Sequence, residues 1–153
     1  MPSHSWTRRS YVADVLVVPL DPTAREDLAA RRDSLTGVTV DSDELDDGLR
    51  KAVERADAIT LVTCDLSLVD HAAVAALGEA ARAAGILLGA VIVAPGLSWS
   101  SDDEYASAAV LREYVDTIAV LRDLPPVLHF LQVLRGGTRD SEEESWPCPT
   151  GGR

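Results

Sequence analysis

Five residues whose side chains could do chemistry lie within one short segment, directly after a β-branched, apolar run. The segment supplies a thiol, two carboxylates, a hydroxyl and an imidazole: Cys64, Asp65, Ser67, Asp70 and His71. A cysteine with a histidine base, and an aspartate to orient the imidazole, is the arrangement of nucleophilic catalysis. The structural alternative is that the thiol is buried and that Asp70 caps a helix. We favour the structural interpretation and predict no catalytic residue; binding of a small ligand here is the alternative.

The same segment does not have the features of a phosphate loop or a zinc site. A phosphate loop needs close-approaching backbone N–H groups, which favours glycine, whereas residues 63–71 contain two carboxylates and no glycine. One cysteine, one histidine and two aspartates at this spacing match no familiar zinc pattern. The sequence therefore predicts neither a metal nor a cofactor.

The elements that must position these residues alternate between strand and helix patterns. Apolar, β-branched runs predict strands at 12–20, 37–40, 58–63, 86–94 and 117–121. Capping residues and apolar spacing predict helices at 21–32, 41–55, 70–84, 104–114 and 125–134. This order predicts a three-layer α/β fold: a mostly parallel, five-stranded, Rossmann-like sheet with helices on both faces.

Domain organisation follows from the same pattern. We expect a flexible N-terminus at 1–10, a single α/β domain at 11–135 and a disordered acidic tail at 136–153.

Trp99 lies in the loop after the 86–94 strand. Because the carboxyl ends of parallel strands meet at one edge, we expect Trp99 and Cys64 to share a surface.

Composition excludes several classes of partner. The net charge of −11 and the sequence pI near 4.5 argue against nucleic acid and anionic membranes as partners. There is no apolar run of about 18 residues, so no membrane span is expected. Asp14 interrupts the only candidate signal segment, and two cysteines give no disulfide framework. A cytoplasmic location is expected.

Three consecutive blocks of the chain resemble FtsZ, the bacterial tubulin homologue. They are LRKAVERADAITLVT at 49–63, HAAVAALGEAARAAGILLGAVIVAPG at 71–96 and LREYVDTIAVL at 111–121. The resemblance implies a fold like the FtsZ N-terminal domain. FtsZ proteins bind GTP between subunits, polymerise and organise the division septum.

The chain departs from the FtsZ pattern at the residues that bind nucleotide. The glycine-rich signature of the family falls on 65–71, where every glycine is missing, and the asparagine that recognises the base is replaced by Asp123. The resemblance thus implies a truncated, non-catalytic derivative that acts through protein–protein contacts in cell division or an assembly. GTPase activity is not expected. The candidate ligand-binding set is Cys64, Asp65, Ser67, Asp70, His71, Trp99 and Asp123.

The last predicted helix is apolar nearly all round, which favours a homodimer. Its apolar residues are Val127, Leu128, Phe130, Leu131, Val133 and Leu134. Two alternatives to the FtsZ-like interpretation stay open. One is a small α/β ligand-binding protein or enzyme using Cys64, Asp65 and His71. The other is a receiver-like signalling domain, disfavoured because no strand end offers an acidic pair with a matched aspartate and lysine, the only lysine being Lys51.

Overall fold

The computed structural model describes residues 12–35, 38–40 and 47–136. In chain order the strands are β1 (Val15–Pro19), β2 (Val38–Val40), β3 (Ala58–Thr63), β4 (Leu87–Val93) and β5 (Thr117–Leu121). The α-helices are α1 (Pro22–Ala30), α2 (Asp47–Arg55), α3 (His71–Ala84), α4 (Asp102–Tyr114) and α5 (Pro125–Arg135). Two short 3₁₀ turns, η1 (Arg32–Ser34) and η2 (Leu66–Leu68), complete the described elements.

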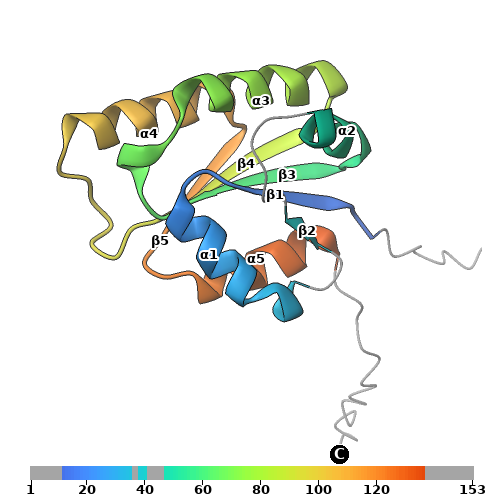
Figure 1. Ribbon diagram of the computed structural model, residues 1–153, viewed down its shortest axis with the longest axis horizontal. Coiled ribbons are helices and arrows are strands. Elements are labelled where there is room, and N and C mark those ends of the chain that lie inside the picture. Colours follow the sequence, from blue (N-terminus) through green and yellow to red (C-terminus); the bar gives the residue numbers. More distant parts are fainter. Residues whose placement is uncertain (1–11, 36–37, 41–46, 137–153) are drawn as a thin grey trace, which may run out of the picture.

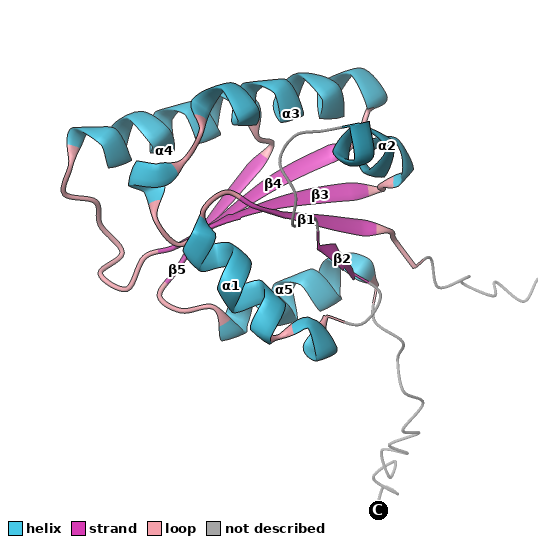
Figure 2. Cartoon of the chain, in the orientation of Figure 1, coloured by secondary structure: helices cyan, strands magenta, loops and turns pink. Residues whose placement is uncertain are grey.

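The strands form a single parallel sheet in the order β2-β1-β3-β4-β5, shown in Figure 2. Four strands of five to seven residues make up its body, and β2, with three residues, lies at the edge beside β1. The α/β, Rossmann-like fold with a parallel sheet and flanking helices is therefore confirmed. Of the five predicted strands, four form the body of the sheet, and the one predicted at 37–40 is only the three-residue edge strand β2. The 2-1-3-4-5 order is the flavodoxin-like arrangement of doubly wound sheets.

Helices cover both faces of the sheet. In Figure 1, α2, α3 and α4 lie above the sheet, and α1 and α5 lie below it. Side chains of β1 alternate between these layers: Leu16 and Val18 join the core under α2, α3 and α4, while Val15 and Val17 join the core with α1 and α5. Burial on both faces explains why the strands are continuous apolar runs.

Local signals set most helix ends where the sequence predicts them. Asp21 caps α1 with Pro22 in its first turn, and Gly85 ends α3 in the left-handed region at φ 68°. Helix α4 begins two residues earlier than expected. The reason is a capping box, in which Ser101 accepts from the backbone N–H of Glu104 and the Glu104 carboxylate accepts from that of Ser101.

Helix α5 is covered by its own chain. Val127 and Leu131 are fully buried in the core shared with β1 and α1, and Leu128, Phe130 and Leu134 pack against that core half-buried. Val133 alone among the apolar residues of α5 is largely exposed, at 76%. The apolar surface on which the homodimer prediction rests is thus mostly covered within one chain; the dimer itself stays a prediction.

Some sequence predictions fall outside the described residues. These are the flexible N-terminus at 1–10, the tail predicted at 136–153 apart from Gly136, and the predicted helix start at 41–46, so all three stay predictions. Among the described helices, none is long and apolar enough to span a bilayer.

Candidate functional site

The switch point of the sheet lies between β1 and β3, because the helices after these two strands go to opposite faces. Helix α1 follows β1 onto one face, and α3 follows β3 onto the other (Figure 1). In open α/β sheets this crevice at the carboxyl ends of the strands is the usual ligand site. Asp21 lies in the connection between β1 and α1, directly before the first residue of the helix. Cys64 and Asp65 directly follow the last residue of β3.

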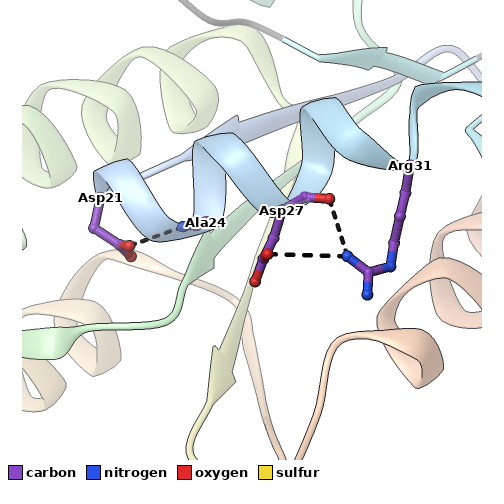
Figure 3. Close-up of polar contacts among 4 residues, drawn as sticks. All are labelled: Asp21, Ala24, Asp27 and Arg31. Atoms are coloured by element: carbon purple, nitrogen blue, oxygen red, sulfur yellow. Dashed lines mark hydrogen bonds and ion pairs between the residues drawn. The ribbon is translucent and has the colours of Figure 1, made fainter.

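The carboxylate of Asp21 is buried at this switch point and bonds to the loops that follow both strands. Its side chain is 2% exposed, at the first turn of α1 (Figure 3). The Oδ1 atom accepts from the backbone N–H of Ala24 at 2.9 Å. The Oδ2 atom accepts from the backbone N–H of Cys64 at 2.7 Å and from that of Asp65 at 3.3 Å. One buried carboxylate therefore caps a helix and ties the β1 and β3 loops together.

The sequence predicts the capping role of Asp21 but not the bonds across the crevice. Asp21 and Cys64 are 43 positions apart, and no local pattern signals their contact. The one available hint is the β1–β3 pairing itself, since neighbouring parallel strands bring their following loops together.

Cys64 is placed to be inert. Burial, and then the negative charges of Asp21 and Asp27, raise the pKa of its thiol to about 11. The thiol is therefore protonated at neutral pH and a weak nucleophile. Asp27 is itself near a cation: Arg31 Nη1 lies 4.0 Å from its Oδ1 and donates to its backbone carbonyl at 3.2 Å (Figure 3).

Catalysis would need the imidazole of His71 to contact the thiol of Cys64, but its partner in the structure is Ser107. Its Nε2 lies 2.9 Å from Oγ of Ser107, a buried residue of α4, so this pair joins the start of α3 to α4. The sequence analysis did not predict a role for Ser107, which makes this contact between α3 and α4. The two residues are 36 positions apart, so no local pattern indicates that they meet. The imidazole thus bonds to a hydroxyl of α4 rather than activating the thiol.

Asp65 caps the short turn η2, and Asp70 caps helix α3. Oδ1 of Asp65 accepts from the backbone N–H of Ser67 at 3.0 Å and from its hydroxyl at 2.6 Å, at the start of η2. Oδ1 of Asp70 accepts from the N–H groups of Ala72 and Ala73 at 2.9 and 3.2 Å, which makes it the predicted N-cap of α3. Both carboxylates are engaged in local backbone structure.

The structure does bring Cys64 and Trp99 to one cavity, of about 110 Å³, at the carboxyl ends of β3 and β4. Its described lining residues are Cys64, Leu66, Ile92, Val93, Ala94, Pro95, Gly96, Ser98, Trp99 and Glu104. The other predicted site residues are not part of that lining. Asp123 is exposed after β5, and Ser67 and Asp70 are exposed on the β3–α3 connection.

Glu104 fixes the loop that forms one wall of this cavity. Its Oε2 atom accepts from the backbone N–H groups of Ser100 and Ser101 at 2.7 and 2.9 Å. These bonds hold the pKa of the Glu104 carboxyl below its usual range. The β4–α4 loop is therefore held at its α4 end by charge-assisted bonds.

Metal-ligating side chains are not clustered in the part of the chain that the structure describes. Within it, no three His, Cys, Asp or Glu residues are grouped so that they could hold an ion.

Comparison with known proteins supplies no family for this chain. No family model matches it, and neither does any curated protein. Among solved structures, it is similar to a pilus assembly-related protein from Burkholderia pseudomallei, with 16% identity, 82% of this chain and 92% of that chain covered, and a TM-score of 0.45. It is also similar to the receiver domain of a histidine kinase from Arabidopsis thaliana, crystallised with Mg²⁺, with 12% identity, 82% and 94% covered, and a TM-score of 0.46. A third is the N-terminal domain of an uncharacterized protein from Wolinella succinogenes, with 17% identity, 81% and 94% covered, and a TM-score of 0.43.

The predicted relation to FtsZ and tubulin is wrong. No FtsZ or tubulin family model matches the chain, and the sheet has the flavodoxin-like strand order β2-β1-β3-β4-β5. The three matching blocks each contain a helix-to-strand unit with small or apolar residues, which parallel α/β sheets share regardless of function. The predicted pseudo-GTPase role in cell division depended on this relation and is therefore wrong as well.

The alternative of a small-molecule site or enzyme around Cys64, Asp65 and His71 is not supported either. Each of the three residues already bonds within the chain through its backbone or side chain.

Proposed function

We propose that this chain is a receiver-like signalling domain that acts by contact with another protein and takes up no phosphoryl group or nucleotide at its switch point. The 2-1-3-4-5 strand order supports this proposal, because flavodoxin and the receiver CheY share it. The order is compatible with both cofactor binding and signalling, so the choice between them rests on the switch point.

The observation that carries the proposal is the bond from the backbone N–H of Cys64 to Oδ2 of Asp21, at 2.7 Å. An anionic ligand at this place would need backbone donors and a favourable local charge. Here Asp21 takes the N–H groups of Cys64 and Asp65 for itself and adds a buried negative charge. The carboxylate acts as an internal substitute for an external anion.

A phosphoryl group on Asp65 would meet two further obstacles. The Asp65 carboxylate is engaged with the backbone N–H and hydroxyl of Ser67, and the buried carboxylate of Asp21 bonds to the Asp65 N–H. Phosphoryl transfer depends on cationic groups that neutralise developing charge. The chain's only lysine, Lys51, is on α2, an element separate from the strand ends.

Incubation with acetyl phosphate and Mg²⁺, followed by intact-mass spectrometry, tests the proposal. We expect no phosphorylated species, with a phosphorylatable receiver domain treated in parallel as the positive control. A phosphorylated species that disappears in Asp65→Asn would contradict the proposal. The cytoplasmic location and the absence of a nucleic-acid partner stay predictions from charge and cysteine content.

A further inference from the structure

The two edges of the sheet differ in how they are protected. An edge strand exposes unpaired N–H and C=O groups, and proteins shield such edges with short strands, charged residues, proline or a bulge. Strand β2, at one edge, has three residues. Strand β5, at the other edge, has five residues, contains neither a charged residue nor a proline, and pairs with β4 in continuous register. Of the two edges that the structure describes, β5 is therefore the better template for a further strand.

The side chains of β5 are less buried than those of the inner strands. All six residues of β3 are buried, whereas Ile118, Ala119 and Leu121 are only half-buried. Val120 is 36% exposed. Ile118 packs against the core on one face of the sheet, and Ala119 and Leu121 pack against the core on the other. A strand added beside β5 would extend both apolar layers.

The backbone groups that face outward from β5 belong to Ile118 and Val120. The carbonyl of Leu121 faces β4, because it accepts from the backbone N–H of Ala94 at 2.7 Å. Successive residues of a strand direct their N–H and C=O groups to opposite edges, so Ile118 and Val120 direct theirs away from β4. Among the described strands, β4 is the only neighbour of β5. Each of the two residues therefore offers one donor and one acceptor to an incoming strand.

The two ends of β5 carry opposite charges. Asp116 directly precedes the strand and Arg122 directly follows it, and both are exposed. Oδ2 of Asp116 accepts from the backbone N–H of Leu88 at 2.9 Å, which leaves its Oδ1 for a second donor. Within the described part of the chain, no carboxylate lies within ion-pair distance of Arg122. The strand is thus complementary in charge to an antiparallel copy of itself.

We propose that a second copy of this chain pairs with β5 in antiparallel orientation, with the two Ala119 residues opposite each other. In this register Ile118 of each copy lies opposite Val120 of the other, so their outward N–H and C=O groups bond to each other. Asp116 of each copy lies opposite Arg122 of the other, which gives two ion pairs related by the twofold axis. A register centred on Ile118 or Val120 would separate these charges. The dimer has one sheet that is continuous across both chains.

Sedimentation equilibrium of the full chain tests the inference. The salt concentration is about 0.15 M, at which repulsion between two chains of net charge −11 is screened beyond about 8 Å. We expect the mean mass to rise with concentration from 16.3 kDa toward twice that value.

Reversed charges at the ends of β5 test the register. Arg122→Glu and Asp116→Arg should each raise the dissociation constant of the dimer about tenfold, because like charges then lie opposite each other. An equimolar mixture of the two variants should dimerise as wild type, since the heterodimer restores both ion pairs. Arg25→Glu is the matched control. Arg25 is exposed on α1, a helix that contacts β1 and β3, and this variant should dimerise as wild type.

Amide hydrogen exchange tests the strand pairing itself. The N–H groups of Ile118 and Val120 should exchange at least about tenfold more slowly at concentrations where the dimer prevails than where the monomer prevails. The N–H of Ala119 faces β4 and is the internal control, protected equally in both conditions.

Three outcomes overturn the inference. The first is a chain that stays monomeric at its highest soluble concentration, as it would if β5 takes a strand of a different protein. The second is a dimer in which Ile118 and Val120 exchange as fast as in the monomer. The third is a mixture of the two charge variants that associates no more tightly than each variant alone. The acetyl phosphate experiment is independent of this dimer, so phosphorylation of Asp65 would refute the proposed function and leave the β5 contact intact.

Discussion

Oδ2 of Asp21 lies 2.7 Å from the backbone nitrogen of Cys64, which joins the loops after β1 and β3 across 43 positions of sequence. The bond closes the switch point of the sheet with a side chain of the protein itself. Because Asp21 occupies the usual ligand site of the fold, this bond supports our proposal that the domain acts through its outer surfaces.

Asp21→Ala should destabilise the domain strongly. The variant removes the cap of α1 and leaves the N–H groups of Cys64 and Asp65 without their acceptor. We expect the free energy of unfolding to fall by about 2–4 kcal/mol, measured by urea denaturation. Asp21→Asn keeps an acceptor oxygen and should lose less. Equal stability of wild type and Asp21→Ala would show that the bridge does not form.

The thiol of Cys64 should react slowly. In a Cys148→Ser background, alkylation at pH 8 should be at least about tenfold slower in the folded chain than in urea, because little thiolate is present. The raised pKa also sets a pH dependence of stability. Below pH 9.0 the thiol is protonated in both states, and between pH 9.0 and about 11 only the unfolded state ionises, so stability falls in that range. A thiol as reactive as free cysteine would contradict this placement.

Gly78 should tolerate no side chain. A Cβ at this position would lie 2.7 Å from Cβ and 2.9 Å from Cδ1 of Tyr114, where α3 packs against α4. Alanine normally stabilises a helix interior relative to glycine by about 0.5–1 kcal/mol. Here the overlap should reverse the sign, and Gly78→Ala should cost about 1–3 kcal/mol in thermal or chemical unfolding. Adding Tyr114→Gly, which removes both of these tyrosine atoms, should make the glycine-to-alanine change at position 78 favourable again. A stabilising single variant would refute the close packing.

The Glu104 carboxylate should titrate below the ordinary glutamate value of 4.5, because the N–H groups of Ser100 and Ser101 bind its ionised form. A depressed pKa in the folded state means that the stabilisation is present above the unfolded value and is lost as pH falls through the folded one. Amide resonances of Ser100 and Ser101 should follow this titration. In Glu104→Gln the titration should vanish; its persistence would assign it to another group.

The local parts of the fold were predictable from the sequence. The spacing of apolar residues placed β3 at its observed bounds, and Asp21, Asp70 and Gly85 act as the caps that their residue types indicate. These signals lie within a few positions of the structure that they specify.

The site was less predictable because its contacts join distant parts of the chain. The Asp21–Cys64 and His71–Ser107 pairs cross 43 and 36 positions, and the order in which strands pair is not contained in any single segment. The FtsZ comparison failed for the same reason, since matching helix–strand units do not specify the order of strands in the sheet.

The most direct test of the closed switch point is an NMR titration of ¹⁵N-labelled protein with Mg²⁺ and beryllofluoride, a mimic of the phosphoryl group. The amide resonances of Cys64 and Asp65 should not move, because Asp21 already accepts their hydrogen bonds. Saturable shifts of these two amides would show that an external anion can displace Asp21, and would contradict a domain that works through its surface alone.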